Sequence, residues 1–282
     1  MDLPRPLVTP EWLREHLGEP GLVVADVRWI PGGHASTRYA EGHIPGAVSF
    51  DLDADLAAQP FDGPGRHPLP PAEVFAATMS AAGIGDDDAV VAYDDAGGSV
   101  AARLWWMLDV TGHDAAVLDG GLAAWDGPIE TDPGQNPVPA SFEARPWPRD
   151  SLVDAAGVEG ALRDGAVVLD ARAPERFRGE TEPFDRVAGH IPGARSAPWE
   201  SNLDPETGRF LSPERLRARF EALGAGADAN AVASCGSGTT ACHDVLARRV
   251  AGLGATRLYE GSWSDWSSDP ERPVATGNGD DA

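Results

Sequence analysis

Short apolar runs rich in β-branched residues alternate along the chain with longer stretches of mixed polarity. The runs Leu22–Val27 and Val167–Leu169 each follow a helix-like stretch, and the tripeptide Asp-x-Arg stands at the end of each. A further run, VVAYDD from Val90, precedes the helix-like stretch SVAARLWWMLDVTG. Strands that alternate with helices are typical of parallel sheets joined by crossover helices, so the pattern predicts an α/β fold.

The same motifs occur twice, in the same order. The hexapeptide GHIPGA starts at Gly42 and again at Gly189, while VLDGGLAAW ends at Trp125 and LYEGSWSDW ends at Trp266. Between these motifs, AVVAYDDAGGS in the first half has its counterpart NAVASCGSGTT in the second. Matched blocks in one order indicate a duplicated domain.

Two tandem domains are therefore expected, each a mainly parallel sheet flanked by helices. We place the first domain at residues 7–126 and the second at residues 151–273. Residues 127–150 contain six prolines and are typical of a linker, and residues 274–282 are expected to form a tail. In sheets of this kind, ligands bind to loops at the carboxyl ends of the strands.

Charge and composition narrow the class of function. The 282 residues include 45 acidic and 22 basic side chains, for a formal net charge of -23. This excess argues against nucleic acid and membranes as partners, since both attract basic surfaces. No apolar run approaches the roughly 18 residues of a membrane-spanning helix, and the N-terminus is unlike a signal peptide, so we expect a cytoplasmic protein. The chain has no lysine, which excludes lysine Schiff bases and a GxxxxGK[ST] phosphate loop.

The cysteines and histidines predict neither a disulfide nor a metal site. Cys235 and Cys242 are the only cysteines, and on one helix their Cα atoms would lie about 10 Å apart, too far for a disulfide. The seven histidines are scattered, and neither HxxxH nor CxxC occurs. We expect no metal and no cofactor.

The segment around Cys235 is typical of a strand end, a tight loop and a helix start. Gly236 and Gly238 let the backbone curl so that its N–H groups form an anion-binding nest, and the helix dipole adds positive potential. In this nest we expect Cys235 to be a reactive thiol, and the nest offers a place for an anionic persulfide. Three hydroxyl groups could either bond that sulfur or cap the helix. They belong to Ser237, Thr239 and Thr240.

The first copy differs at the position of this cysteine. Aligning the copies on Trp125 and Trp266, an offset of 141, places Asp94 opposite Cys235. A packing residue is seldom interchangeable with a charged one, so we expect this position to be exposed and only the second copy to be catalytic. Cys242, two turns into the following helix, is expected to be a buried packing residue.

Two other cysteine chemistries fit the sequence poorly. A cysteine phosphatase needs an arginine at the sixth position after the nucleophile, where this chain has Ala241. A cysteine protease needs a histidine base, and His243 would point along the helix rather than at the thiol.

With these motifs, the chain resembles the two-domain sulfurtransferases with tandem rhodanese domains, which use 3-mercaptopyruvate or thiosulfate. The resemblance extends from about residue 7 to about residue 273 and includes GHIPGA, DARAPERFRG from Asp170, CGSGTTAC and GSWSDW. It implies a silent N-terminal domain and a C-terminal domain in which Cys235 is catalytic. The implied persulfide cradle comprises Gly236, Ser237, Gly238, Thr239 and Thr240.

The resemblance also implies a donor. Family members with basic residues after the cysteine favour thiosulfate, whereas members with CGSG resemble 3-mercaptopyruvate sulfurtransferases. The donor's carboxylate would then be held by arginines between Asp170 and GHIPGA, namely Arg176 and Arg186, with Arg178 as an alternative to the latter. His43 and His190 occur in both copies, which favours a structural role for both.

The leading hypothesis is a ping-pong sulfurtransferase. The Cys235 thiolate would take a sulfur atom from 3-mercaptopyruvate, and cyanide, a thiol or thioredoxin would accept it. Two alternatives remain open on the sequence: thiosulfate as the donor, or a non-catalytic module that carries a persulfide received from a partner.

Overall fold

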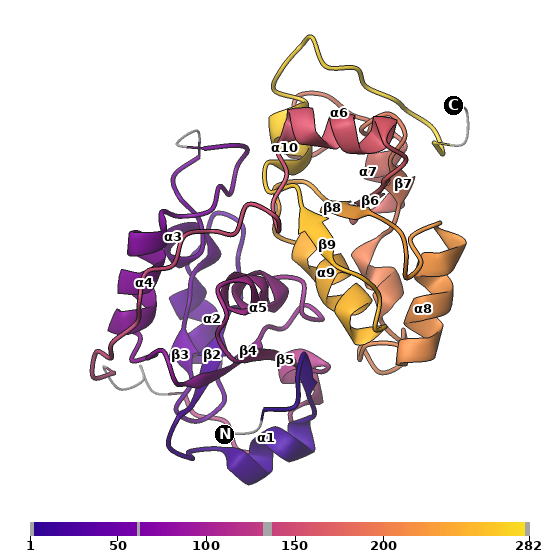
Figure 1. The fold of residues 1–282 in the computed structure, drawn as a ribbon. Helices are drawn as coiled ribbons and strands as arrows, with labels where there is room; N and C mark the ends of the chain where they lie inside the picture. Colours follow the sequence, from indigo (N-terminus) through magenta and orange to yellow (C-terminus); the bar gives the residue numbers. More distant parts are fainter. Residues whose placement is uncertain (1–2, 61–62, 132–136, 280–282) are drawn as a thin grey trace. The chain divides into compact units, whose positions relative to one another are not determined.

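The backbone is shown in Figure 1, from a computed structural model that describes residues 3–60, 63–131 and 137–279. Residues 132–136 of the predicted linker and 280–282 of the predicted tail lie outside the described residues. Within the described part of the chain, no helix is long and apolar enough to cross a membrane.

The chain divides into two compact units, each built on one sheet. The main body of the first unit is followed in sequence by that of the second, but each unit also includes a short segment from the other half of the chain. The first unit consists of residues 1–58, 70–148 and 204–210, and the second of residues 59–69, 149–203 and 211–282.

The sheet of the first unit has the strand order β1-β5-β4-β2-β3, and all neighbouring strands run parallel. Its strands are β1 (Leu7–Val8), β2 (Leu22–Asp26), β3 (Val48–Ser49), β4 (Ala89–Tyr93) and β5 (Ala115–Leu118). Its helices are α1 (Pro10–His16), α2 (Ala35–Glu41), α3 (Leu52–Asp55), α4 (Ala72–Ala81), α5 (Ala101–Val110) and the 3-10 turn η1 (Gly121–Ala124).

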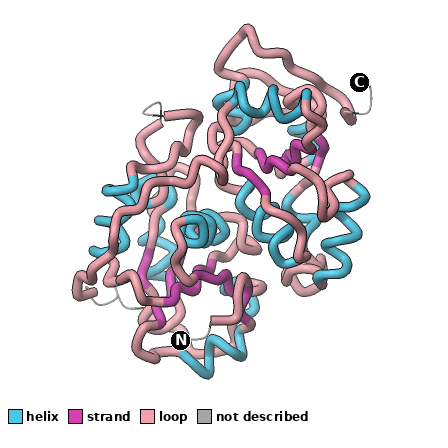
Figure 2. The backbone as a smooth tube through the Cα atoms, viewed as in Figure 1, coloured by secondary structure: helices cyan, strands magenta, loops and turns pink. Residues whose placement is uncertain are grey.

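The sheet of the second unit has the strand order β7-β6-β8-β9 and is also parallel. Its strands are β6 (Val167–Asp170), β7 (Arg195–Ser196), β8 (Ala231–Ser234) and β9 (Thr256–Leu258). Its helices are α6 (Ala155–Arg163), α7 (Pro174–Phe177), η2 (Trp199–Asn202), α8 (Pro213–Ala222), α9 (Ala241–Val250) and α10 (Ser262–Trp266). Helices α6 and α10 cover one face of the sheet and α8 and α9 the other (Figure 1), while long loops connect the short strands (Figure 2).

The predicted α/β fold is confirmed, and local sequence explains its elements. The central strands β4 and β8 are buried along their whole length, as parallel strands covered on both faces must be. Helix α6 begins where the Asp154 carboxylate accepts the Gly157 N–H. Helix α8 begins after Ser212, whose hydroxyl accepts a backbone N–H, with a proline in its first turn.

The register of the second sheet brings two functional segments together. Asp170 at the end of β6 is paired with Ser234 at the end of β8. The loop that follows β6 therefore leaves the sheet beside the loop that carries Cys235. In the first unit, Asp26 is paired with Tyr93 in the same way, directly before Asp94.

Candidate functional site

Cys235 lies between the last residue of β8 and the start of α9, as the strand–loop–helix pattern predicts. Its backbone is held on both sides, since its N–H donates to the Ser262 hydroxyl at 3.0 Å and its carbonyl accepts the Trp263 N–H at 3.0 Å. Ser262 adopts φ +51, a conformation that non-glycine residues seldom hold without a structural demand. The nucleophile is thus fixed by the start of α10 as well as by its own loop.

The prediction that this position is exposed is wrong. Cys235 and Asp94 are each only 1% exposed. A charged counterpart in the other copy suggested solvent exposure, whereas in the structure the backbone of the loop takes the place of solvent.

The loop of the first unit shows how an anion is held there. The Asp94 carboxylate accepts four backbone N–H bonds of 2.8–2.9 Å, from Ala96, Gly98, Val100 and Ala101. Burial raises the pKa of Asp94, and these four bonds act in the opposite direction. The loop is an anion nest that its own aspartate fills.

In the second unit one backbone N–H of the corresponding loop faces a sulfur atom instead. The Gly238 N–H lies 3.1 Å from Cys235 Sγ, and the Ser262 hydroxyl oxygen lies 3.9 Å from it. Gly238 has φ +79, and a Cβ atom at this residue would lie 2.3 Å from the Glu260 carbonyl oxygen. Only glycine fits here, so the sequence places the sulfur-facing N–H where it is needed.

The hydroxyl groups of the loop have different surroundings. His67 Nδ1 lies 2.7 Å from the Ser237 hydroxyl oxygen, and Ser237 is buried. Thr240 occupies the N-cap position of α9, but its side chain makes no capping hydrogen bond. Among the described residues, the buried Thr239 hydroxyl has no hydrogen-bond partner. Ser237 is therefore the loop hydroxyl group that is hydrogen-bonded to an imidazole ring.

Two residues of α9 to which the sequence assigned no catalytic role are buried in that helix. Cys242 donates to the Gly238 carbonyl at 3.4 Å, and it shares no disulfide with Cys235. His243 Nδ1 lies 3.1 Å from Asn202 Nδ2, and its ring packs against Trp199. Both support the helix that follows the nucleophile.

A buried ion-pair network connects β6 to the loop after α7. Arg172 pairs with Asp170 at 2.6 Å and with Glu182 at 3.3 Å, and its guanidinium group stacks 4.8 Å from the Trp263 ring centre. Arg176 donates to Glu182 at 2.7 Å. Glu182 therefore holds two guanidinium groups and orients Arg176.

The Asp170–Arg172 pair has a counterpart in the first unit. Arg28 pairs with Asp26 at 2.6 Å, and both residues are buried. In each unit the arginine also donates to the backbone carbonyl of the glycine that starts GHIPGA, Gly42 or Gly189. Because the first unit, which has Asp94 in place of the cysteine, keeps this pair as well, the pair serves the fold rather than the chemistry.

The predicted substrate arginines occupy different places. A methyl group on Gly236 would lie 3.5 Å from both terminal nitrogens of Arg176, so Arg176 reaches the loop of the nucleophile. Arg186 is exposed and lines a cavity together with Arg66, Phe184 and Asp185. Arg178 is paired with Glu180 at 2.7 Å on the surface.

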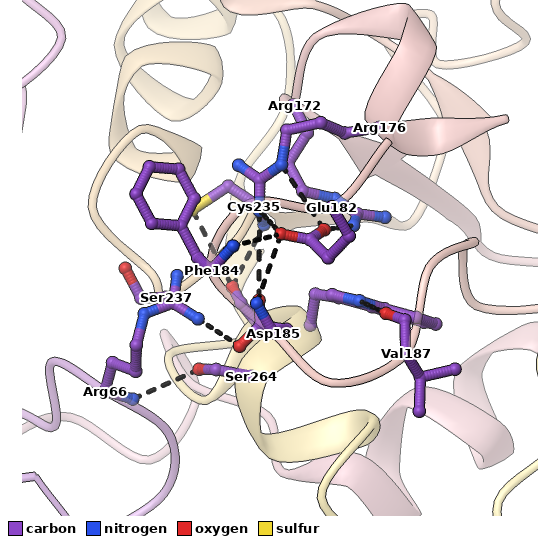
Figure 3. Close-up of polar contacts among 12 residues, drawn as sticks. Arg66, Arg172, Arg176, Glu182, Phe184, Asp185, Val187, Cys235, Ser237 and Ser264 are labelled. Carbon is purple, nitrogen blue, oxygen red and sulfur yellow. Dashed lines mark hydrogen bonds and ion pairs between the residues drawn. The ribbon is translucent and has the colours of Figure 1, made fainter. Parts of the chain in front are cut away.

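Two residues that the sequence motifs did not indicate also belong to this site. Arg66 Nη2 would lie 3.1 Å from a methyl group on Gly236, closer than Arg176, and His67 contacts Ser237. Both come from residues 59–69, which belong to the second unit. Figure 3 shows Arg66, Arg176 and Asp185 near Cys235.

The histidine residues of the two GHIPGA segments make packing and backbone contacts. His43 stacks on Tyr39 and forms an antiparallel bridge with Glu130, while His190 stacks on Phe177 and forms the same bridge with Ala275. No group of three or more His, Cys, Asp or Glu side chains that could hold a metal ion occurs among the described residues.

Comparisons with known proteins identify the family to which the chain is similar. The family description "Rhodanese-like domain" matches residues 9–127 and 154–269. A Pseudomonas aeruginosa protein with the provisional name 3-mercaptopyruvate sulfurtransferase is 47% identical, over 96% of this chain and 98% of that protein. A Mycobacterium tuberculosis protein with the provisional name thiosulfate sulfurtransferase SseB is 42% identical, over 92% of each. The solved structure of the 3-mercaptopyruvate sulfurtransferase from Leishmania major is 31% identical, with a TM-score of 0.82 over 95% of this chain and 75% of that one.

Proposed function

This chain belongs to the family of rhodanese-like domains, and from that premise we propose that it is a sulfurtransferase that takes sulfur from 3-mercaptopyruvate through a persulfide on Cys235. One observation carries the proposal. Corresponding loops occur in both units: backbone N–H groups hold the Asp94 carboxylate in the first, and the Gly238 N–H faces the Cys235 sulfur in the second. A nest that accommodates a buried carboxylate can also accommodate the anionic outer sulfur of a persulfide.

The choice of donor rests on the neutral loop and on the nearby cations. Gly236 and Ser237 bring no charge to the nucleophile, so an arginine must come from elsewhere to hold the donor's carboxylate. Arg176 reaches Gly236 and Arg186 lines the adjoining cavity, which supports both as carboxylate-binding residues. The Pseudomonas and Leishmania proteins are named for the same donor.

The first half-reaction moves one sulfur atom and one proton. The Cys235 thiolate attacks the donor's sulfur, an S–S bond forms, and the C–S bond breaks with its electron pair on carbon. The resulting enolate must gain a proton to become pyruvate, and the donor's own S–H has one to lose. The Ser237 hydroxyl and His67, 2.7 Å apart beside the nucleophile, are placed to relay this proton.

The second half-reaction returns the cysteine. Cyanide, a thiol or the thiolate of thioredoxin attacks the outer sulfur of the persulfide, and the Cys235 thiolate leaves. Residues 236–240 hold the outer sulfur in the interval between the two steps. The protein gains a sulfur atom in the first half-reaction and loses it in the second, which is the basis of ping-pong kinetics.

Mass spectrometry tests the proposal directly. After incubation with 3-mercaptopyruvate, Cys235 should carry one additional sulfur atom and the solution should contain an equal amount of pyruvate. The Cys235→Ser variant is the control and should do neither. An unmodified Cys235 in the wild-type protein, with no pyruvate released, would overturn the proposal.

Thiosulfate is the second candidate donor, because the Mycobacterium relative is named for it. The ratio of kcat/KM for the two donors decides between them. A strong preference for thiosulfate would contradict the proposal that the neutral residues Gly236 and Ser237 favour 3-mercaptopyruvate.

A further inference from the structure

Two large apolar side chains are exposed in the loop between α7 and β7. Phe184 is 56% exposed and Val187 is 38% exposed, and Phe184 also lines a cavity of about 470 Å³. Ser264 lines the same cavity and donates its N–H to the Gly236 carbonyl at 2.9 Å, so the cavity adjoins the loop of the nucleophile. Phe184 and Val187 therefore form an apolar rim beside the candidate catalytic loop.

Buried polar contacts hold both rim residues in place. The Phe184 N–H donates at 3.1 Å to Glu182, whose side chain is 3% exposed. The Val187 carbonyl accepts the indole N–H of Trp263 at 2.9 Å, and the Trp263 backbone N–H donates to the Cys235 carbonyl at 3.0 Å. Figure 3 shows both rim side chains. The rim is thus preorganised, which lowers the entropic cost of binding a partner to it.

The corresponding segment of the first unit buries its aromatic residue. There the residues before GHIPGA form helix α2, and Tyr39 in that helix is 6% exposed, with its hydroxyl group donating to the Ala47 carbonyl at 2.6 Å. In the second unit the residues before GHIPGA form an irregular loop that leaves Phe184 exposed. The duplicated fold therefore does not demand exposed apolar residues here, and the rim belongs to the unit that contains the cysteine.

Cationic groups accompany the rim. The guanidinium carbons of Arg66 and Arg176 lie 5.6 and 5.0 Å from the centre of the Phe184 ring. Asp185 pairs with Arg66, whereas the exposed Arg186 forms no ion pair among the described residues. On a chain with a net charge of -23, these cations give the rim a local attraction for anions. A surface that is both apolar and cationic fits a partner that presents a thiolate with apolar side chains beside it.

The acceptor half-reaction indicates which partner would use the rim. Cys235 is only 1% exposed, so the attacking atom of an acceptor has to enter the site. Cyanide and small thiols can do so without covering Phe184 or Val187. A protein that inserts a thiolate brings its own surface against the rim, and burial of the two apolar side chains then stabilises the complex.

We propose that the apolar rim of Phe184 and Val187 is the docking surface for a protein acceptor with a reactive thiol flanked by apolar side chains. The inference rests on the proposed function and deepens its second half-reaction. The partner's thiolate attacks the outer sulfur of the Cys235 persulfide, and a new S–S bond forms. The bond from the outer sulfur to Cys235 breaks, and its electron pair stays on the Cys235 sulfur. The partner leaves as a persulfide, so no oxidant or reductant is consumed.

Sulfur transfer from a preformed persulfide tests the rim separately from the donor. The protein is loaded with 3-mercaptopyruvate, freed of donor, and mixed with reduced thioredoxin as the protein-thiol probe or with cyanide. For Val187→Ser we expect the second-order rate constant with thioredoxin to fall about tenfold, because an apolar contact with the partner is lost, and the rate constant with cyanide to stay within about twofold. Val138→Ser, at an 85% exposed valine of the first unit, is the matched control and should behave as wild type with both acceptors.

Val187 suits this test because its side chain is separate from the catalytic groups. It is not among the described residues that line the cavity, and its carbonyl rather than its side chain bonds Trp263. Thermal melts identify a variant that fails to fold, in which case Val187→Thr, which keeps the shape of valine, replaces Val187→Ser with the same expected direction.

Three kinetic results would overturn the inference. The first is an unchanged rate with thioredoxin in Val187→Ser. The second is an equal loss with thioredoxin and with cyanide, because Val187 would then support the nucleophile rather than a partner. The third is a wild-type persulfide that reacts with cyanide but not with thioredoxin.

Two further outcomes are distinguishable from these. A wild-type dimer in light scattering that becomes a monomer in Val187→Ser would assign the rim to a second copy of this chain and overturn the inference. Failure of the proposed function would instead leave Cys235 unmodified by 3-mercaptopyruvate. Loading Cys235 with thiosulfate or inorganic polysulfide then allows the same comparison of acceptors.

Discussion

His67 and Ser237 are separated by 170 positions in the chain, yet His67 Nδ1 lies 2.7 Å from the Ser237 hydroxyl oxygen. Ser237 is the second residue after the nucleophile, and His67 belongs to a segment that joins the second unit from the first half of the sequence. A hydroxyl group paired with an imidazole can deliver a proton to a carbon that is losing sulfur, or it can merely brace the loop.

A comparison of 3-mercaptopyruvate with thiosulfate as the donor distinguishes proton transfer from a bracing role. We expect His67→Ala to lower the rate of pyruvate release from 3-mercaptopyruvate about 100-fold, because the enolate then lacks its proton relay. Transfer from thiosulfate should be nearly unaffected, since the departing sulfite needs no proton on carbon. Pyruvate and thiocyanate assays on the same preparation measure both. An equal loss with both donors would assign His67 a bracing role.

The fold and the strand–loop–helix setting of Cys235 could be predicted from the sequence because the segments that form them are continuous. A buried strand, a glycine-containing loop and a helix follow one another around both Asp94 and Cys235, and the structure has β4 and β8 ending directly before these residues. Comparison of the repeated motifs then shows an aspartate in one copy where the other has a cysteine. None of this requires knowledge of which distant segments meet.

Arg66 and His67 could not be predicted because their role depends on a distant contact. The duplication does contain a signal, since Gly65–Arg66 in GPGRHPLP matches Gly208–Arg209 in ETGRFLSP. In the structure, residues 59–69 belong to the second unit, where the Leu69 N–H donates to Glu260. Residues 204–210 belong to the first unit, where the Phe210 N–H donates to Asp119. Periodicity and turn residues do not specify such pairings.

The error about exposure has a similar cause. A carboxylate at position 94 indicated contact with solvent, but its four hydrogen bonds come from the backbone. The conformation that directs those N–H groups inward is set by the glycines and by the start of the helix. A residue-by-residue comparison of the two copies does not reveal this backbone conformation.

Asp94 should therefore contribute to stability. Replacing it by Ala leaves four buried N–H groups without their acceptor, and we expect Asp94→Ala to lower the free energy of unfolding by about 2–4 kcal/mol. Urea denaturation measures this change. Asp95→Ala, at the next and exposed position, is the control and should cost less than about 1 kcal/mol. Similar losses in the two variants would contradict the description of the loop as a filled anion nest.

Gly238 should tolerate no side chain. In Gly238→Ala the new Cβ atom would lie 2.3 Å from the Glu260 carbonyl oxygen at φ +79, so the loop must shift and the N–H that faces Cys235 Sγ moves with it. We expect persulfide formation to fall by more than about 100-fold, the scale on which one oriented donor contributes to catalysis. The assay is the mass spectrum of Cys235 after brief exposure to donor.

Gly165 provides the matched control for this substitution. It has the same φ of +79, but an added Cβ atom would meet nothing within 4 Å. Gly165→Ala should cost about 1 kcal/mol of stability through backbone strain alone, with full activity. If Gly165→Ala were as inactive as Gly238→Ala, strain rather than the position of the N–H would explain the loss.

The helix that follows the nucleophile contains a buried carboxyl group that makes stability depend on pH. Burial raises the pKa of Asp244 from 3.8 to about 7, against the attraction of Arg219 and a hydrogen bond from Asn202. The folded state therefore binds this proton more tightly than the unfolded state does. Between pH 3.8 and about 7 the folded state holds more protons, so the contribution of Asp244 to stability is complete below this window and is lost as the pH rises through it.

Asp244→Asn removes the ionisable group while keeping an oxygen that can accept the Asn202 hydrogen bond. Between pH 5 and pH 7, the free energy of unfolding of the wild-type protein should fall by on the order of 2 kcal/mol relative to that of Asp244→Asn. Urea denaturation at several pH values measures the difference, and Asp228→Asn, at an exposed position, should follow the wild type. Parallel curves for wild type and Asp244→Asn would mean that Asp244 is already ionised in the folded protein at pH 5. In that case Arg219 and Arg248, the cations that lower its pKa, would outweigh its burial.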